Sequence, residues 1–237
     1  MKLFLFLLFL WITVVVGRID GRHDVFDSSE DSTSSEEMTG RAVNRDSFED
    51  SEGSEGSSEK SEKKGKSCPG EWMSFDRSQG KWCVKVFMSN GNFLSAETLC
   101  RSYNSTLTGF QTNDERLKIA DVAKQMIQSR GIEVALMWIG ARRKSNCPTA
   151  GMCFADETFY WTDNFTKVKE AFEFSSGQPD ASLNNRHNQN WGHESCLQQM
   201  IFASGTTHPK YASFQGQLND LHCQNPEVQM CACGRRP

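Results

Sequence analysis

The sequence predicts a single α+β domain held by disulfide bonds, and three observations lead to that prediction. All nine cysteines lie in residues 67–237, and none precedes Cys68. Two segments early in that region repeat apolar residues at helical spacing, whereas the apolar runs after them have the length of strands. Helices and strands that are grouped, rather than strictly alternating, are typical of α+β folds.

The first 17 residues predict the compartment. After Met1 and Lys2 comes an apolar run that ends at Gly17. One positive charge, a short apolar stretch and a small residue at its end are typical of a cleaved secretory signal peptide. The run is shorter than the roughly 20 residues of a membrane span. We therefore expect a secreted, extracellular protein with no membrane span, whose cysteines form disulfides.

Residues 18–66 are predicted to be a disordered leader rich in serine and acidic residues. From residue 27 on, this leader holds 12 acidic side chains, 6 basic side chains and 11 serines. It has too few apolar residues to offset the entropy of ordering. Residues 67–237 carry almost equal numbers of basic and acidic side chains and have the length of one domain. A nucleic-acid partner, which requires a strong positive field, is therefore not expected.

The start of the domain predicts a hairpin and a helix. Cys68 and Cys83 bracket an aromatic stretch with turn residues at its centre, which predicts a hairpin closed by a disulfide. The next apolar residues recur every three or four positions after Ser95. This spacing predicts a short helix with Ser95 as its N-cap and Cys100 on its buried face.

A second helix and two strands follow. Thr112 and Glu115 have the spacing of a capping box, and Gly131 is placed to end the helix that they begin. The apolar run 134–139 is too short for another helix and predicts a buried strand. The aromatic run 159–161 predicts a further strand.

Apart from this strand, residues 142–192 are mainly polar and rich in turn residues, and Cys147 and Cys153 are close enough to close one local loop. A compact domain rarely contains so long a loop unless it is functional or held by bonds, so we expect a binding site here. No hydrolase or zinc-protease motif is present, which indicates that the protein is not an enzyme. The histidines are expected to be solvated; they are His23, His187, His193, His208 and His222.

The order of several motifs resembles the C-type lectin-like domain, in its long form with an additional N-terminal hairpin. The resemblance covers residues 68–233, and the longer loops are similar to those of secreted nematode members of the family. It implies two helices packed on small antiparallel sheets and a long ligand-binding loop. The matching residues are Cys68-Pro69, Cys83, Cys100, Trp138-Ile139-Gly140, Trp161-Thr162-Asp163, Gln178-Pro179-Asp180, Glu194-Ser195-Cys196, Asn219-Asp220, Cys223 and Cys231.

The resemblance also implies how the distant cysteines pair. Cys233 is then left over, and two alternatives remain open for it: a disulfide-linked dimer with a second copy, or an unpaired thiol. The four expected disulfides are Cys68 with Cys83, Cys100 with Cys231, Cys147 with Cys153, and Cys196 with Cys223.

A calcium site is predicted from five side chains of the matching motifs: Gln178, Asp180, Glu194, Asn219 and Asp220. They offer three carboxylates and two amides, and a calcium ion takes about six to eight oxygen ligands. Five protein side chains therefore leave coordination positions open. In the lectins that the sequence resembles, two sugar hydroxyls fill these positions and form hydrogen bonds with the same carboxylates and amides.

The order of amide and acid in the tripeptide indicates the sugar. Gln178-Pro179-Asp180 resembles galactose-type lectins, whereas Glu-Pro-Asn is typical of mannose-type lectins; in the family the proline is cis. Galactose binders usually carry a Trp just after the tripeptide, where this chain has Ala181. The ring contact would therefore have to come from Trp191. Ser195 stands where an auxiliary calcium site usually has Asp, so we expect one calcium site.

The sequence thus predicts a secreted, calcium-dependent lectin for galactose-type glycans, with a role in innate-immune recognition of microbial or host glycans. Two sequons predict a glycoprotein modified at Asn104 and Asn164. The alternative is a calcium-independent protein-interaction module on the same scaffold, which binds no sugar.

Overall fold

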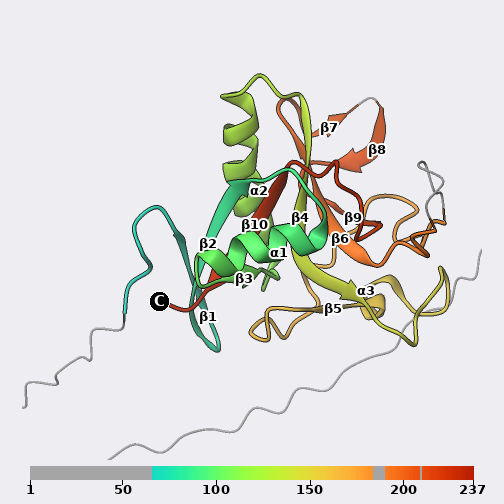
Figure 1. Cartoon of the computed structure of the whole chain (residues 1–237), viewed down its shortest axis with the longest axis horizontal. Coiled ribbons are helices and arrows are strands. Elements are labelled where there is room, and N and C mark those ends of the chain that lie inside the picture. The colour runs from blue at the N-terminus through green and yellow to red at the C-terminus, as the bar shows by residue number, and fades with distance from the viewer. Residues whose placement is uncertain (1–65, 184–189, 209) are drawn as a thin grey trace, which may run out of the picture. The chain divides into compact units, whose positions relative to one another are not determined.

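The computed structural model describes residues 66–183, 190–208 and 210–237 (Figure 1). The predicted signal peptide (1–17) and all but the last residue of the predicted leader (18–66) lie outside the described residues. Within the described residues, no helix is long and apolar enough to cross a membrane.

Three helices and ten strands form the described part of the chain. The helices are α1 (Phe93–Ser102), α2 (Asn113–Gln128) and α3 (Ala155–Thr158). The strands are β1 (Met73–Arg77), β2 (Gly80–Met88), β3 (Thr106–Leu107), β4 (Val134–Arg143), β5 (Phe159–Trp161), β6 (Cys196–Phe202), β7 (Thr207–His208), β8 (Tyr211–Phe214), β9 (Leu218–Leu221) and β10 (Met230–Arg235).

Eight of these strands form one sheet, in the order β1-β2-β10-β4-β6-β9, with β3 beside β10 and β5 beside β4. Strands β7 and β8 form a separate hairpin. The expected α+β class is confirmed, but the small antiparallel sheets expected from the resemblance are replaced by one larger, mixed sheet. The reason is that β10, the last strand, returns to the middle of the sheet and pairs parallel with β4.

The two long helices begin at side-chain caps, one of which differs from the prediction. Thr112 caps α2 as predicted, because its side-chain oxygen accepts the backbone N–H of Glu115. Helix α1 begins earlier than predicted: Asn92 is its N-cap, and its Oδ1 accepts the backbone N–H of Ser95 at 2.9 Å. Both residue types are good N-caps, so the local sequence could not distinguish Asn92 from Ser95.

The alternation of side chains along β4 separates two layers. Met137 and Ile139 pack with the apolar side of α2, whereas Leu136 and Trp138 pack with α1. The helices therefore cover opposite faces of the sheet, and Figure 1 shows α1 crossing in front of it. Trp138 is fully buried, and its indole N–H donates to the carbonyl of Gly91 at 2.9 Å. The layer under α1 is thus apolar, and the one polar group of Trp138 is satisfied.

Gly140 lets β4 approach a neighbouring segment more closely than any other residue would. A Cβ at this position would lie 2.1 Å from the carbonyl oxygen of Leu107. The Gly140 N–H donates to the carbonyl of Thr108 at 2.8 Å. The glycine of the Trp-Ile-Gly motif is therefore required by packing.

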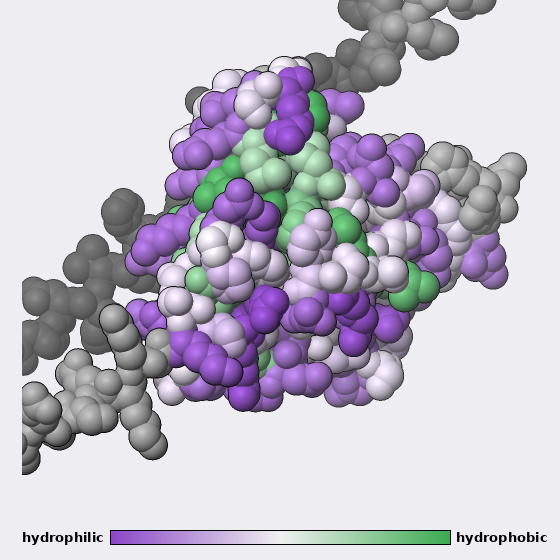
Figure 2. All heavy atoms as spheres, turned by 60° about the vertical axis from the view of Figure 1, so that its left-hand side comes forward, coloured by the Kyte–Doolittle hydropathy of each residue, from purple (hydrophilic) through white to green (hydrophobic). Residues whose placement is uncertain are grey.

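Figure 2 shows one face of the molecule, on which hydrophilic residues predominate and hydrophobic residues gather in its upper half.

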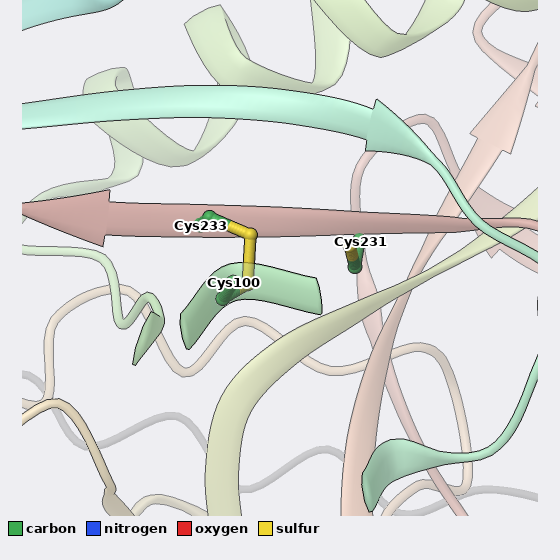
Figure 3. A group of neighbouring side chains, drawn as sticks. All are labelled: Cys100, Cys231 and Cys233. Carbon is green, nitrogen blue, oxygen red and sulfur yellow. A yellow bond between two sulfur atoms is a disulfide. The ribbon is translucent and has the colours of Figure 1, made fainter. Parts of the chain in front are cut away.

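The disulfides correct one predicted pairing. The three pairs Cys68 with Cys83, Cys147 with Cys153 and Cys196 with Cys223 form as predicted. Cys100, however, pairs with Cys233 rather than with Cys231 (Figure 3).

The register of β10 explains this difference. Cys231 and Cys233 are two residues apart on one strand and face the same side, and their sulfur atoms and that of Cys100 lie within 4.8 Å of one another. Cys233 stands opposite Leu107 of β3, the strand that follows α1, whereas Cys231 stands beside Trp138. Cys233 is therefore not available for the disulfide to a second copy, and the unpaired thiol is the buried Cys231.

Candidate functional site

A pocket of about 450 Å³ lies on the face of the sheet that α1 covers further along. Its floor consists of side chains from β4, β6 and β9. The register pairs Leu136 with Met200 and Gln198 with Asn219, so these side chains point to one side of the sheet. The residues that line the pocket are Val134, Leu136, Asp180, Ser182, Trp191, Glu194, Gln198, Met200, Lys210, Tyr211, Asn219, Leu221, His222, Asn225, Glu227 and Gln229.

Three carboxylates meet at one end of this pocket. Asp180, Glu194 and Asp220 each place an oxygen so that the three oxygens lie within 4.8 Å of one another. Asp180 follows the Gln178–Pro179 peptide bond, which is cis. Glu194 lies two residues before β6, in the loop between Asp180 and Cys196 (the long loop), and Asp220 lies in β9. Three segments far apart in the sequence thus bring negative charge to one point.

Asp220 lies at the buried base of the cluster, with no exposed surface. Its Oδ1 accepts the backbone N–H of Asp180 at 3.2 Å, and its Oδ2 accepts the backbone N–H of Ala181 at 2.9 Å. Oδ2 also forms an ion pair with Arg143 at 2.5 Å. Because a carboxylate oxygen has two lone pairs, Oδ1 keeps one for a further partner while Oδ2 is fully used.

The side chain of Arg143 is buried and contacts several segments of the site. Its guanidinium also donates to the carbonyls of Glu194 at 2.8 Å and of Cys147 at 3.1 Å. It therefore connects β4 to the end of the long loop and to the small disulfide loop. Arg143 is not among the predicted site residues, because nothing in the local sequence shows that an arginine in a polar stretch is buried against Asp220.

Among the three carboxylates, Glu194 has the pKa that its surroundings shift furthest. Burial, and then the neighbouring charges of Asp220 and Asp180, raise the pKa of Glu194 to about 8. The imidazole Nδ1 of His222 lies 3.4 Å from Glu194 Oε1. His222 is buried, so the prediction that it is solvated is wrong: it follows β9 directly, and the long loop covers it, with its Nε2 3.1 Å from the carbonyl oxygen of Gly192.

The two predicted amide ligands lie beside the carboxylates. Asn219 precedes Asp220 in β9, and its Oδ1 is buried with no hydrogen-bond partner among the described residues. Gln178 Oε1 accepts the backbone N–H of Asp180 at 3.2 Å. Trp191 comes from the long loop and lines the pocket, with its ring centroid 5.7 Å from that of His222. All six predicted site residues therefore lie around one end of the pocket or next to it.

The structure also places Ser195 and the two predicted glycosylation positions. The Ser195 hydroxyl donates to the backbone carbonyl of His193 at 2.8 Å. Asn104 and Asn164, the predicted glycosylation positions, both lie on the surface. Both are accessible to a glycan in the folded domain.

The donor set fits a calcium-sized cation. Asp180, Glu194 and Asp220 Oδ1 supply carboxylate oxygens, and Asn219 Oδ1 supplies a buried oxygen that has no other partner in the described part of the chain. A buried polar atom without a partner costs about 1–3 kcal/mol, and a cation bound there would remove that cost. Oxygen donors without thiolate or imidazole favour a hard cation.

Comparisons of the sequence with known proteins identify a family and a relative. The family model of the C-type lectin domain-containing protein 141/158 matches residues 73–232. A curated relative, C-type lectin domain-containing protein 158 of Caenorhabditis elegans, is 27% identical over 176 residues, which are 66% of this chain and 77% of the relative.

Similar solved structures have low sequence identity. The C-type lectin domain of murine dendritic cell inhibitory receptor 2, in complex with N-glycan, has a TM-score of 0.44 at 17% identity and covers 72% of this chain and 100% of its own. Human lithostathine has a TM-score of 0.45 at 17% identity, with 72% and 92% covered. The family model, in contrast, spans more than half of the chain. The chain therefore belongs to the C-type lectin domain-containing protein 141/158 family.

Proposed function

We propose that the protein is a secreted, calcium-dependent lectin that binds galactose-type glycans at the acidic end of the pocket. The observation that carries this proposal is the meeting of Asp180, Glu194 and Asp220 within 4.8 Å, beside the unpartnered oxygen of Asn219. Gln178 and Asp180 supply the amide and the acid of the galactose-type tripeptide. The predicted signal peptide at residues 1–17 supports secretion.

Each residue of the proposed site has a role in sugar binding that follows from its chemistry. A bound calcium ion would supply open coordination positions for two neighbouring sugar hydroxyls. Asp180 and Glu194 accept hydrogen bonds from these hydroxyls, whereas the amides of Gln178 and Asn219 donate to them. Trp191 offers an aromatic ring at the pocket wall for the apolar face of the sugar.

One observation favours a second candidate function, a calcium-independent protein-interaction module. The guanidinium of Arg143 already neutralises Asp220 in the buried base of the site. A fixed internal cation can hold the long loop in place without calcium. The two candidate functions differ in two properties: whether the site binds calcium, and whether the protein then binds a sugar.

The deciding experiment is retention on a galactose resin, combined with a calorimetric calcium titration. We expect binding of one calcium ion and retention that EDTA reverses. Retention that survives EDTA would exclude the calcium mechanism. Failure to bind any glycan on an array in the presence of calcium would support the protein-interaction candidate.

A double substitution tests the choice of sugar. Gln178→Glu with Asp180→Asn exchanges acid and amide and should move the preference from galactose to mannose while calcium binding persists. An unchanged preference would contradict the assignment of the tripeptide. Asp121→Asn, an exposed position on α2 at the opposite face of the sheet, is the matched control.

A further inference from the structure

The pocket continues well beyond the three carboxylates. Its far end is lined by Val134, Leu136 and Met200 from the sheet and by Lys210 and Tyr211 from the β7–β8 hairpin. None of these residues belongs to the predicted calcium or sugar site. A volume of about 450 Å³ also lies within the range of roughly 300–1,000 Å³ that is typical of ligand sites. One sugar ring held at the carboxylates would leave the far end open.

Gln198 is the first sign that this end receives a ligand. It lies between the two ends, and only 1% of its surface is exposed. Its Nε2 contacts the sulfur of Met200 at 3.2 Å, whereas its Oε1 has no hydrogen-bond partner among the described residues. A buried amide with one unsatisfied end is costly, and its terminal torsion rotates easily. A hydroxyl in the pocket would satisfy it.

Tyr211 lines the far end of the pocket with an aromatic ring that packs against neighbouring side chains. Its ring lies 6.3 Å from that of Phe202, in a stacked arrangement, and 5.2 Å from that of His208. The ammonium of Lys210 lies 5.5 Å from the centroid of the same ring. These contacts fix the ring in position, and the low entropy cost of a fixed ring favours binding.

The chemistry of this end indicates the class of ligand. Gln198 Oε1 has no partner among the described residues and can accept a hydrogen bond from a sugar hydroxyl. Asn225 Oδ1 and Gln229 Oε1 already accept the backbone N–H groups of Glu227 and Leu136, so these two amides offer mainly their NH₂ groups as donors. The apolar floor and the tyrosine suit the C–H faces of a sugar ring. Lys210 and Glu227 line the pocket with opposite charges, which favours a neutral unit over an acidic one.

We propose that the pocket is an extended glycan site, in which Gln198 and Tyr211 form a subsite for the second, neutral sugar of a chain whose terminal galactose lies at the carboxylates. This subsite deepens the proposed function and rests on it. With this subsite, the protein binds oligosaccharides more tightly than single sugars.

The test compares methyl galactoside with galactobiose and galactotriose by calorimetry in the presence of calcium. We expect galactobiose to bind the wild-type protein about tenfold more tightly than methyl galactoside, from one aromatic contact and one hydrogen bond. Tyr211→Ala and Gln198→Met should remove this gain and leave the affinity for methyl galactoside unchanged. Phe214→Ala is the matched control, because Phe214 lies on the same hairpin, is 60% exposed and does not line the pocket.

The outcomes separate the subsite from the proposed function. If all three ligands bind equally tightly, or if Tyr211→Ala and Phe214→Ala behave alike, the subsite is overturned while the galactose site stands. If no galactoside binds in the presence of calcium, the proposed function fails and the subsite fails with it. Circular dichroism of Gln198→Met, together with its affinity for methyl galactoside, shows whether the variant is folded.

Discussion

Two parts of one sheet face differ in what covers them. Under α1, the face carries Trp138, Cys231 and Cys233, all fully buried, and a disulfide fixes the helix to β10. Under the long loop and the β7–β8 hairpin, the same face carries Gln198 and Asn219, and a pocket remains open. The strands are shared, so the cover and the choice of side chains decide which part is closed by packing and which part keeps a pocket.

The two parts of the sheet face also differ in whether their buried polar groups have hydrogen-bond partners. Trp138 and Gln198 are neighbours across β4 and β6. The N–H of Trp138 finds a backbone carbonyl, whereas one end of the Gln198 amide has no protein partner in the described ranges. On this face, the part under α1 thus satisfies the polar group of Trp138, whereas the part at the pocket leaves one polar atom of Gln198 for the ligand that we propose.

The largest expected effect comes from breaking the part under α1. Cys100→Ala with Cys233→Ala removes a disulfide that spans 133 residues, and we expect a loss of about 4–5 kcal/mol in the free energy of unfolding, measured in urea. Cys231→Ala should cost only about 1 kcal/mol, because it removes a buried thiol and no bond. Equal losses for Cys231→Ala and Cys233→Ala would show that the pairing in solution is different.

The next effect concerns the charge pair below the pocket. Arg143→Met leaves Asp220 buried without its partner and should lower the free energy of unfolding by about 3–5 kcal/mol without calcium. Calcium should recover part of that loss, because a cation at Asp220 replaces the missing charge. Arg142→Met, at the exposed neighbouring position, is the control and should change little. A loss that calcium leaves undiminished would contradict Asp220 as a calcium ligand.

A smaller effect is expected at the mouth of the pocket. Asp180→Asn should weaken calcium binding by at least about tenfold, or 1.4 kcal/mol, in a calorimetric titration. The free energy of unfolding without calcium should not fall, because the exposed Asp180 carboxylate repels the cluster and an asparagine oxygen can still accept the backbone N–H of Ser182, which Asp180 Oδ1 accepts at 3.1 Å. Unchanged calcium affinity would show that the ligand set is wrong.

The smallest effect is at the free thiol. Burial raises the pKa of Cys231 to about 12, so the thiolate that reacts with iodoacetamide is scarce at pH 8. We expect no modification of the native protein in mass spectra and complete modification of one cysteine after unfolding in guanidinium. Rapid modification of the native protein would mean that the part under α1 opens readily.

Sequence reasoning succeeded where the signal was local. The capping residue Thr112, the hairpin closed by Cys68 and Cys83 and the strand at 159–161 each depend on residues close together in the chain. The ordered set of motifs was sufficient for the family, and the family model confirmed it. The predicted calcium and sugar ligands remain predictions, although the fold brings them to one pocket.

The sequence by itself determined the α+β class, the family, three of the four disulfides and the residue types of the candidate site. Only the tertiary structure decided that Cys233 and not Cys231 joins Cys100, because the register of β10 depends on strands elsewhere in the chain. It also decided that Arg143 and His222 lie buried against the carboxylates. The burial of a polar or charged side chain and the pairing of distant strands depend on the whole packed domain, so the local sequence around these residues does not show them.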